Sequence, residues 1–138
     1  MKNIKLFEDF VNEAFSAKRV ESVIKKTYPQ IVKDLGGKAK KVEVHSDIYT
    51  RLDAVNVEDL MKENNPSAEY DPHDDKIYIY YTAMDSVEEI IRSLLHEHTH
   101  TLQDQKKFKK LYNDGYEYSN HPYELEALDA EKNWKNYL

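Results

Sequence analysis

Apolar residues recur three and four positions apart over the first part of the chain, and this spacing predicts helices. Residues 4–15 carry such a pattern and are expected to form an amphipathic helix. A second helix is expected to begin after Ser16, which is a suitable N-cap, and to end at Gly36 and Gly37. Pro29 lies inside this segment and predicts a kink or a break there.

Strands are predicted in two places. Residues 41–45 (Lys-Val-Glu-Val-His) alternate between apolar and polar side chains, as a short strand does. Residues 77–81 (Ile-Tyr-Ile-Tyr-Tyr) are all β-branched or aromatic, which favours a strand. Between these strands, residues 57–61 indicate one or two helical turns, which the Asn-Asn-Pro sequence at 64–66 should end.

The second half of the chain predicts two more helices. Ser86 and Glu89 form a capping box ahead of a long helix that runs from about residue 87 to beyond residue 103. Pro122 suits the first turn of a last helix, which is expected to reach about Tyr137. Several helices with a few strands between them predict an α+β fold.

Length and composition narrow the possible chemistry. A chain of 138 residues fits one compact domain. It contains no cysteine, which excludes disulfides, thiolate nucleophiles and cysteine-ligated zinc. A metal ion in this protein must therefore be held by histidines and carboxylates.

Charge and hydropathy weigh against nucleic acid and membrane partners. The chain has 26 acidic and 20 basic residues, a net charge of −6, whereas nucleic-acid-binding domains are usually basic. The one basic run, residues 105–110, is interpreted as a solvated helix end. No apolar segment approaches the roughly 18 residues of a membrane span, and the N-terminus lacks a signal peptide. A soluble, intracellular protein is expected.

The strongest chemical signal is the motif His96-Glu97-x-x-His100. Two residues four apart on a helix project from nearly the same side, so both imidazoles can reach one ion. Glu97 is rotated by about 100° from His96 and can reach a water on that ion, as the general base of a zinc peptidase does. His98, in contrast, lies within the apolar stripe of the same helix and is predicted to be a core histidine.

Together with Glu124-x-x-Ala127 farther along the chain, this motif resembles the gluzincin class of zinc metallopeptidases. It is most similar to the very small members found in phages and mobile elements, including the ImmA/IrrE-like group. The resemblance spans about residues 67–131 and implies a minimal zincin-like domain, in which a small sheet packs on an active-site helix and a following ligand helix.

The resemblance also implies roles for particular residues. Glu124 would be the third zinc ligand, and a small residue at position 127 would let the two helices approach closely. Many relatives carry Asp or Asn at the next position, where this chain has Leu128. The residue that supports the metal ligands from that position in relatives therefore has no counterpart at Leu128, and Glu126 remains an alternative ligand.

Substrate and transition-state contacts follow from the same resemblance. In this class an edge strand directly before the metal helix, here residues 77–81, binds substrate in extended form. Tyr116, Tyr118 and His121 precede the ligand helix and are candidate donors to a transition-state oxyanion.

The first 14 residues resemble the short amphipathic leaders of internal head proteins of T4-like phages. Such leaders are cut after a Glu that precedes a small residue, and Glu13-Ala14 matches that site. Residues 1–13 are therefore interpreted as a targeting leader, a pro-segment or an ordinary first helix, ahead of a single domain over 14–138. A host cytoplasmic or virion-interior location is expected.

The sequence thus predicts a zinc-dependent endopeptidase that acts on a protein or peptide through a zinc-activated water. Two alternatives stay open. One is a non-catalytic binding module with a closed zinc site, in which His121 could be a fourth ligand. The other is a packaged phage protein whose motif is vestigial. The substrate and the oligomeric state do not follow from the sequence.

Overall fold

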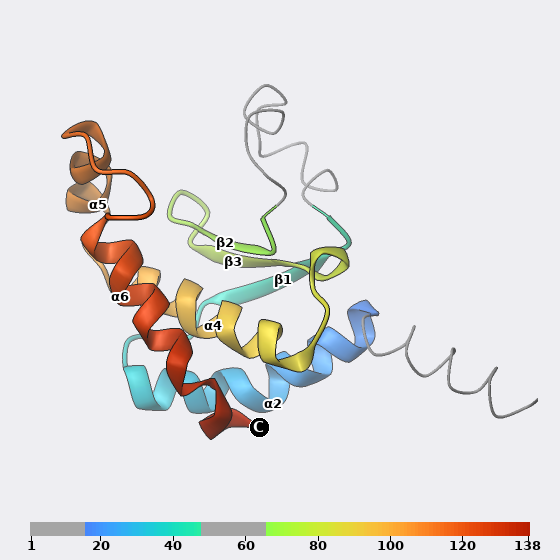
Figure 1. Ribbon diagram of the computed structural model, residues 1–138. Coiled ribbons are helices and arrows are strands. Elements are labelled where there is room, and N and C mark those ends of the chain that lie inside the picture. The colour runs from blue at the N-terminus through green and yellow to red at the C-terminus, as the bar shows by residue number, and fades with distance from the viewer. Residues whose placement is uncertain (1–15, 48–65) are drawn as a thin grey trace, which may run out of the picture.

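The computed structural model describes residues 16–47 and 66–138. In these ranges a three-stranded mixed sheet packs with four α-helices, which is an α+β arrangement (Figure 1). The elements are α2 (Ala17–Leu35), β1 (Lys41–His45), β2 (Ala68–Asp71), β3 (Lys76–Tyr80), η2 (Tyr81–Ala83), α4 (Val87–Thr101), α5 (Gln105–Asn113), α6 (Pro122–Ala130) and η3 (Glu131–Tyr137). The helices predicted at 4–15 and 57–61, and the leader at 1–13, lie outside the described residues.

The sheet has the order β1-β3-β2, with β1 parallel and β2 antiparallel to β3. The strand predicted at 77–81 is therefore the central strand, and the expectation that it forms a sheet edge is wrong. Its apolar residues Ile77 and Ile79 are completely buried, as expected for a strand with a neighbour on each side. The strand ends at Tyr80, and Tyr81 begins the short helix η2.

Strand β2, which the sequence analysis did not predict, forms the edge of the sheet next to α4. The backbone N–H of Tyr80 donates to the carbonyl of Ser67 at 2.9 Å. Ser67 and Tyr80 therefore form a hydrogen-bonded pair. Hydrogen-bonded and non-hydrogen-bonded pairs alternate along an antiparallel ladder, so the backbone N–H and C=O groups of Ala68 and Tyr70 point away from β3. No described strand pairs with that side of β2.

Helix α2 is one continuous helix. Its N-cap is Ser16, as predicted, whose side chain accepts a hydrogen bond from the Arg19 N–H at 3.3 Å. At the other end Gly36 takes a positive φ of 89°, which glycine adopts without strain, and its N–H donates to the Val32 carbonyl. The expected break at Pro29 is wrong, because the helix continues through it.

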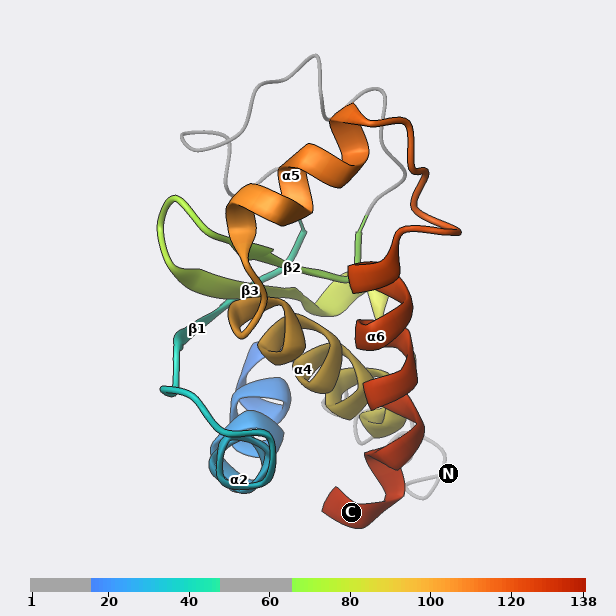
Figure 2. The same cartoon turned by 90° about the vertical axis from the view of Figure 1, so that its left-hand side faces the viewer.

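Helix α4 lies between the sheet, α2 and α6 (Figures 1 and 2). Ser86 caps it through the Glu89 N–H at 3.3 Å, as predicted. It ends at Thr101 rather than beyond residue 103. Asp104 then caps a separate helix, α5, by accepting from two backbone N–H groups. The basic run therefore belongs to α5 and is not the end of α4.

The buried apolar side of α4 packs against α2 and β3 and forms the core. The largest completely buried aliphatic side chains come from these three elements: Ile31, Ile77, Ile79, Ile90, Ile91, Leu94 and Leu95. The core thus occupies one side of α4. Its opposite side faces the sheet edge β2 and the helix α6.

Helix α6 begins at Pro122, as predicted, but it ends at Ala130 and continues as the 3₁₀ helix η3. Ala127 is completely buried on α6, and α6 runs beside α4 (Figure 2). At the end of η3 the Tyr137 hydroxyl donates to Asp34 of α2 at 2.8 Å. This bond ties the C-terminal segment to the core.

Within the described ranges, no helix combines the length and the apolar character that crossing a bilayer requires.

Candidate metal centre

Three buried residues of α4 form a group that could hold a metal ion. His96, Glu97 and His100 are 8%, 7% and 7% exposed. One potential ligand atom from each lies within 4.8 Å of those of the other two. The one-turn separation of the two histidines produces this convergence, as the motif predicts.

Glu124 reaches the same point from α6. Its Oε1 atom lies 3.0 Å from Nε2 of His100, and its Oε2 atom lies 3.3 Å from Nε2 of His96. The residue is 4% exposed. Oε2 is buried, and its geometry towards His96 does not make a hydrogen bond. A buried carboxylate oxygen without a donor is costly unless a cation or a proton meets it.

The other ring nitrogen of each histidine faces an acceptor. His96 Nδ1 lies 2.8 Å from Oε2 of Glu131, and His100 Nδ1 lies 2.7 Å from Oε1 of Gln103. The Gln103 amide donates through Nε2 to the Tyr123 carbonyl at 2.9 Å, which fixes the orientation of the amide. Both Nδ1 atoms must therefore carry the proton and donate it.

A neutral imidazole protonated at Nδ1 presents a lone pair at Nε2. Two such lone pairs then point at the Glu124 carboxylate, which also only accepts. Three acceptors facing one another require a positive charge between them, which either protons on the imidazoles or a metal ion supplies. With nitrogen and oxygen donors and no sulfur, the set suits Zn²⁺.

The pKa values of His96 and Glu124 are also shifted in the directions that favour positive charge between them. Burial lowers the pKa of His96, but the nearby carboxylates of Glu124 and Glu131 outweigh it and raise the pKa to about 10. For Glu124, burial acts to raise the pKa, but the two imidazoles bring it down to about 2. The ion-free site would thus hold protons in place of a metal.

Glu97 lies against the sheet edge. Burial raises the pKa of its carboxyl group, while the two imidazoles and a hydrogen bond with the Tyr70 backbone oppose that rise. Tyr70 belongs to β2, whose backbone groups at this position point away from the sheet. Helix α4 and strand β2 together therefore hold the Glu97 carboxylate beside the two histidines.

A cleft of about 820 Å³ opens over these groups. Its floor is the metal group of α4, and its walls are β2 on one side and α5 with α6 on the other. The lining residues away from the floor include Ser67, Ala68, Glu69, Tyr70, Gln105, Lys106, Phe108, Lys109, Tyr112 and Tyr118.

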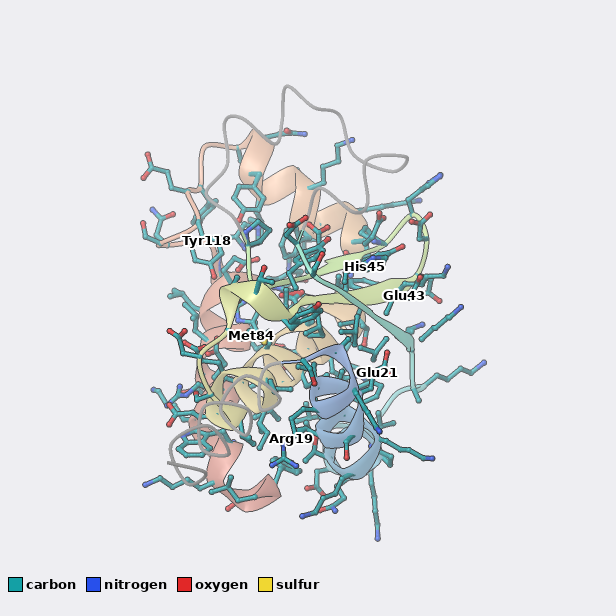
Figure 3. All side chains as sticks on the ribbon, turned by 90° about the vertical axis from the view of Figure 1, so that its right-hand side faces the viewer. Arg19, Glu21, Glu43, His45, Met84 and Tyr118 are labelled. Atoms are coloured by element: carbon teal, nitrogen blue, oxygen red, sulfur yellow. The ribbon has the colours of Figure 1, made fainter. Side chains whose placement is uncertain are left out.

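Only one of the three candidate oxyanion donors lines this cleft. Tyr118 lies in the loop between α5 and α6 (Figure 3). Burial and nearby carboxylates, with a hydrogen bond to Glu124, raise the pKa of Tyr118 to about 12. Tyr116 is 41% exposed and does not line the cleft.

His121 is an N-cap residue in this structure. Its Nδ1 accepts from the Tyr123 N–H at 3.1 Å, and its Nε2 donates to the Phe108 carbonyl at 3.0 Å. Both ring nitrogens are therefore used by the backbone, and the ring is completely buried. This arrangement leaves His121 neither a free donor nor a ligand atom for the metal group.

Glu126, the alternative ligand, lies on the exposed side of α6. Two residues separate it from Glu124, which turns its side chain by about 200° around the helix. The geometry therefore brings Glu124, and not Glu126, to the two histidines.

His98 has the core position that the apolar stripe predicts. It is completely buried. Its Nε2 donates to the Gly36 carbonyl at 2.8 Å, and its Nδ1 accepts from the Tyr28 hydroxyl at 2.8 Å. The Tyr28 oxygen in turn accepts from the Lys40 N–H at 3.0 Å. Burial lowers the pKa of His98, which keeps the ring neutral within this network.

Sequence reasoning did not assign Glu131 or a role for Gln103. Glu131 lies seven residues after Glu124, which is two helical turns and therefore the same side of the chain if the helical path continues. That spacing is the sequence feature from which the position of Glu131 beside Glu124 could have been predicted. Gln103 lies three residues after His100 and follows the end of α4, so its role depends on how the chain turns there.

No protein-family profile matches the sequence, and no curated protein or solved structure shows significant similarity. The site geometry is therefore the basis for the functional proposal.

Proposed function

We propose that this protein is a zinc-dependent endopeptidase in which His96, His100 and Glu124 hold the metal and Glu97 is the general base. The observation that carries the proposal is the convergence of both histidine Nε2 atoms on the Glu124 carboxylate, at 3.3 and 3.0 Å. The Nδ1 partners of both rings support it, because they leave the Nε2 lone pairs free for a metal ion.

The donor set fits a catalytic rather than a structural zinc site. Two imidazoles and one carboxylate leave the fourth position of a tetrahedral ion for water or substrate. A zinc ion bound there would supply a Lewis acid for the substrate carbonyl and would lower the pKa of a water molecule towards about 7. The cleft above the site leaves room for a peptide.

Three parts of the protein would act on the substrate. Glu97 would accept the proton of the attacking water at its carboxylate and pass it to the departing amine. The Tyr118 hydroxyl would donate to the oxygen on which negative charge develops. The outward backbone groups of Ala68 and the carbonyl of Tyr70, whose N–H is already used by Glu97, would pair with an extended peptide, which would give binding with little sequence selectivity.

The principal alternative is a non-catalytic protein with a closed zinc site. The backbone bonds of His121 remove the fourth ligand that this alternative would use. Within residues 16–47 and 66–138, Glu97 is a further group close enough to close the site, because its carboxylate is within 4.8 Å of the histidine ligand atoms. The role of Glu97 therefore distinguishes the two functions.

The experiment compares zinc content and peptide hydrolysis in the wild type and in Glu97→Gln, His100→Ala and Glu126→Gln. We expect one zinc per chain in the wild type and its loss in His100→Ala. Glu97→Gln should keep zinc and lose hydrolysis, while Glu126→Gln, the exposed control on α6, should change neither. Loss of zinc in Glu97→Gln would make Glu97 a ligand and support the closed site. A wild type that binds no zinc after reloading would refute the metal centre.

A further inference from the structure

Helix α5 forms one wall of the cleft, and two contacts of Phe108 fix it there. The Phe108 ring packs edge-on against the His100 ring with a centroid separation of 5.2 Å. The Phe108 carbonyl accepts the hydrogen bond from the completely buried His121. The side chains beside Phe108 on α5 are therefore held at a set position relative to the metal group.

Lysines occupy both faces of α5, and only two of them line the cleft. Lys106 and Lys109 lie one turn apart among the lining residues, while Lys107 and Lys110 do not belong to the lining. None of the four takes part in an ion pair with another residue of the described ranges. This wall is thus positive in a chain whose net charge is −6.

The carboxylates of the cleft lie on its other walls and have partners there. Glu131 accepts from His96 and lies 3.9 Å from Arg92 Nη1. Glu69 on β2 accepts from the Tyr80 hydroxyl at 2.6 Å. A phenol hydroxyl is neutral, so Glu69 keeps its negative charge, but that charge lies on the β2 wall. Within the described residues, the α5 wall presents two lysines and no carboxylate to the cleft, so this wall is positive.

We propose that the cleft selects peptide substrates with an acidic side chain, which binds Lys106 and Lys109 while the peptide backbone pairs with β2. This inference rests on the proposed peptidase function and adds a substrate class to it. A substrate Lys or Arg at the same position would meet two like charges. Each lysine is solvent-exposed, so each contributes modestly, and the pair should change kcat/KM by about 2- to 30-fold.

The test uses peptides of one sequence in which each position in turn carries Glu, Gln or Lys. We measure kcat/KM for the zinc-loaded wild type, for the double variant Lys106→Glu/Lys109→Glu, and for the matched control Lys107→Glu/Lys110→Glu. The control makes the same change in charge on the same helix, outside the cleft. Zinc content and thermal unfolding of all three proteins check that the site and the fold are intact.

We expect the wild type to prefer Glu over Gln and Gln over Lys at one or two positions. The preference should fall or reverse in the cleft variant and persist in the control, and it should weaken at high salt. Equal hydrolysis of the three peptide classes, or the same loss in both double variants, would overturn the acidic preference while leaving the peptidase function intact. Absence of hydrolysis with every peptide despite bound zinc would instead refute the peptidase function, and the substrate preference with it.

Discussion

Nδ1 of His96 donates a hydrogen bond to Oε2 of Glu131 at 2.8 Å, and the two residues come from separate elements, α4 and η3. A carboxylate in this position fixes the ring orientation and holds the proton on Nδ1, so that Nε2 can bind a metal. Leu128 could not do this, because its side chain has no polar atom. Glu131, three residues later, therefore supplies the acceptor for His96 that Leu128 cannot supply.

The first prediction follows from that contact. Glu131→Ala should weaken zinc binding by about 10- to 100-fold, because the His96 ring loses the partner that orients it. Glu131→Gln keeps an acceptor oxygen and should restore most of the affinity. Zinc affinity from chelator competition measures both variants, with the exposed Glu126→Ala as control. Equal affinity of Glu131→Ala and wild type would show that the hydrogen bond does not support the site.

The second prediction concerns Tyr118. If its hydroxyl donates to the developing oxyanion, Tyr118→Phe should lower kcat by about 100-fold and change KM little. Zinc content and thermal unfolding should stay unchanged, since the residue is 55% exposed. Tyr116→Phe, in the same loop but outside the cleft, is the matched control. A fall in zinc content rather than in kcat would assign Tyr118 to supporting Glu124 instead.

The third prediction concerns the buried network of His98. Replacing His98 with Leu leaves the Tyr28 hydroxyl and the Gly36 carbonyl without their partner. The free energy of unfolding should fall by about 1–3 kcal/mol, which urea titration measures. If the two residues act as one network, His98→Leu/Tyr28→Phe should cost less than the sum of the single changes. Additive costs would argue against coupling.

The fourth prediction concerns alkaline stability. Burial and the bond to Asp34 raise the pKa of Tyr137 to about 12, from the 10.0 of an unperturbed tyrosine. The folded state therefore keeps the phenol proton more firmly than the unfolded state does. The stability from this difference is complete below pH 10 and is lost as the pH rises from 10 to 12.

Unfolding in urea at several pH values between 9 and 12 checks this, with Tyr137→Phe as the comparison. The wild type should lose more of its free energy of unfolding over this interval than the variant does. Part of the loss should remain in the variant, because the pKa of Tyr118 is also raised, to about 12. Identical pH profiles would mean that the proton on Tyr137 does not contribute.

Local patterns along the chain were enough to predict several elements of the structure. The alternation at 41–45 predicted a strand, although β3 supplies the hydrogen bonds of that strand. The caps Ser16 and Ser86 and the Pro122 helix start depend on contacts within a few residues. The same holds for the approach of the two motif histidines, because one turn of α4 sets their separation. Such features need no information about the rest of the chain.

Other features depended on residues far apart in sequence. Strand β2 has four residues, too few for a clear alternation, and it forms because β3 supplies its hydrogen bonds. The same pairing makes β3 central rather than an edge. The end of α4 at Thr101 also escaped prediction, because the capping residue Asp104 starts a new helix within a run that still looks helical.

The sequence by itself determined that α4 carries two imidazoles and a carboxylate at metal-binding spacing. Only the tertiary structure decided which acidic residues meet them. The packing of α6 on α4 brings Glu124 to both Nε2 atoms, turns Glu126 to the solvent and places Glu131 on His96. The physical reason is that a helix sets the angle between its own side chains, whereas the partner that each side chain meets depends on how the helices pack.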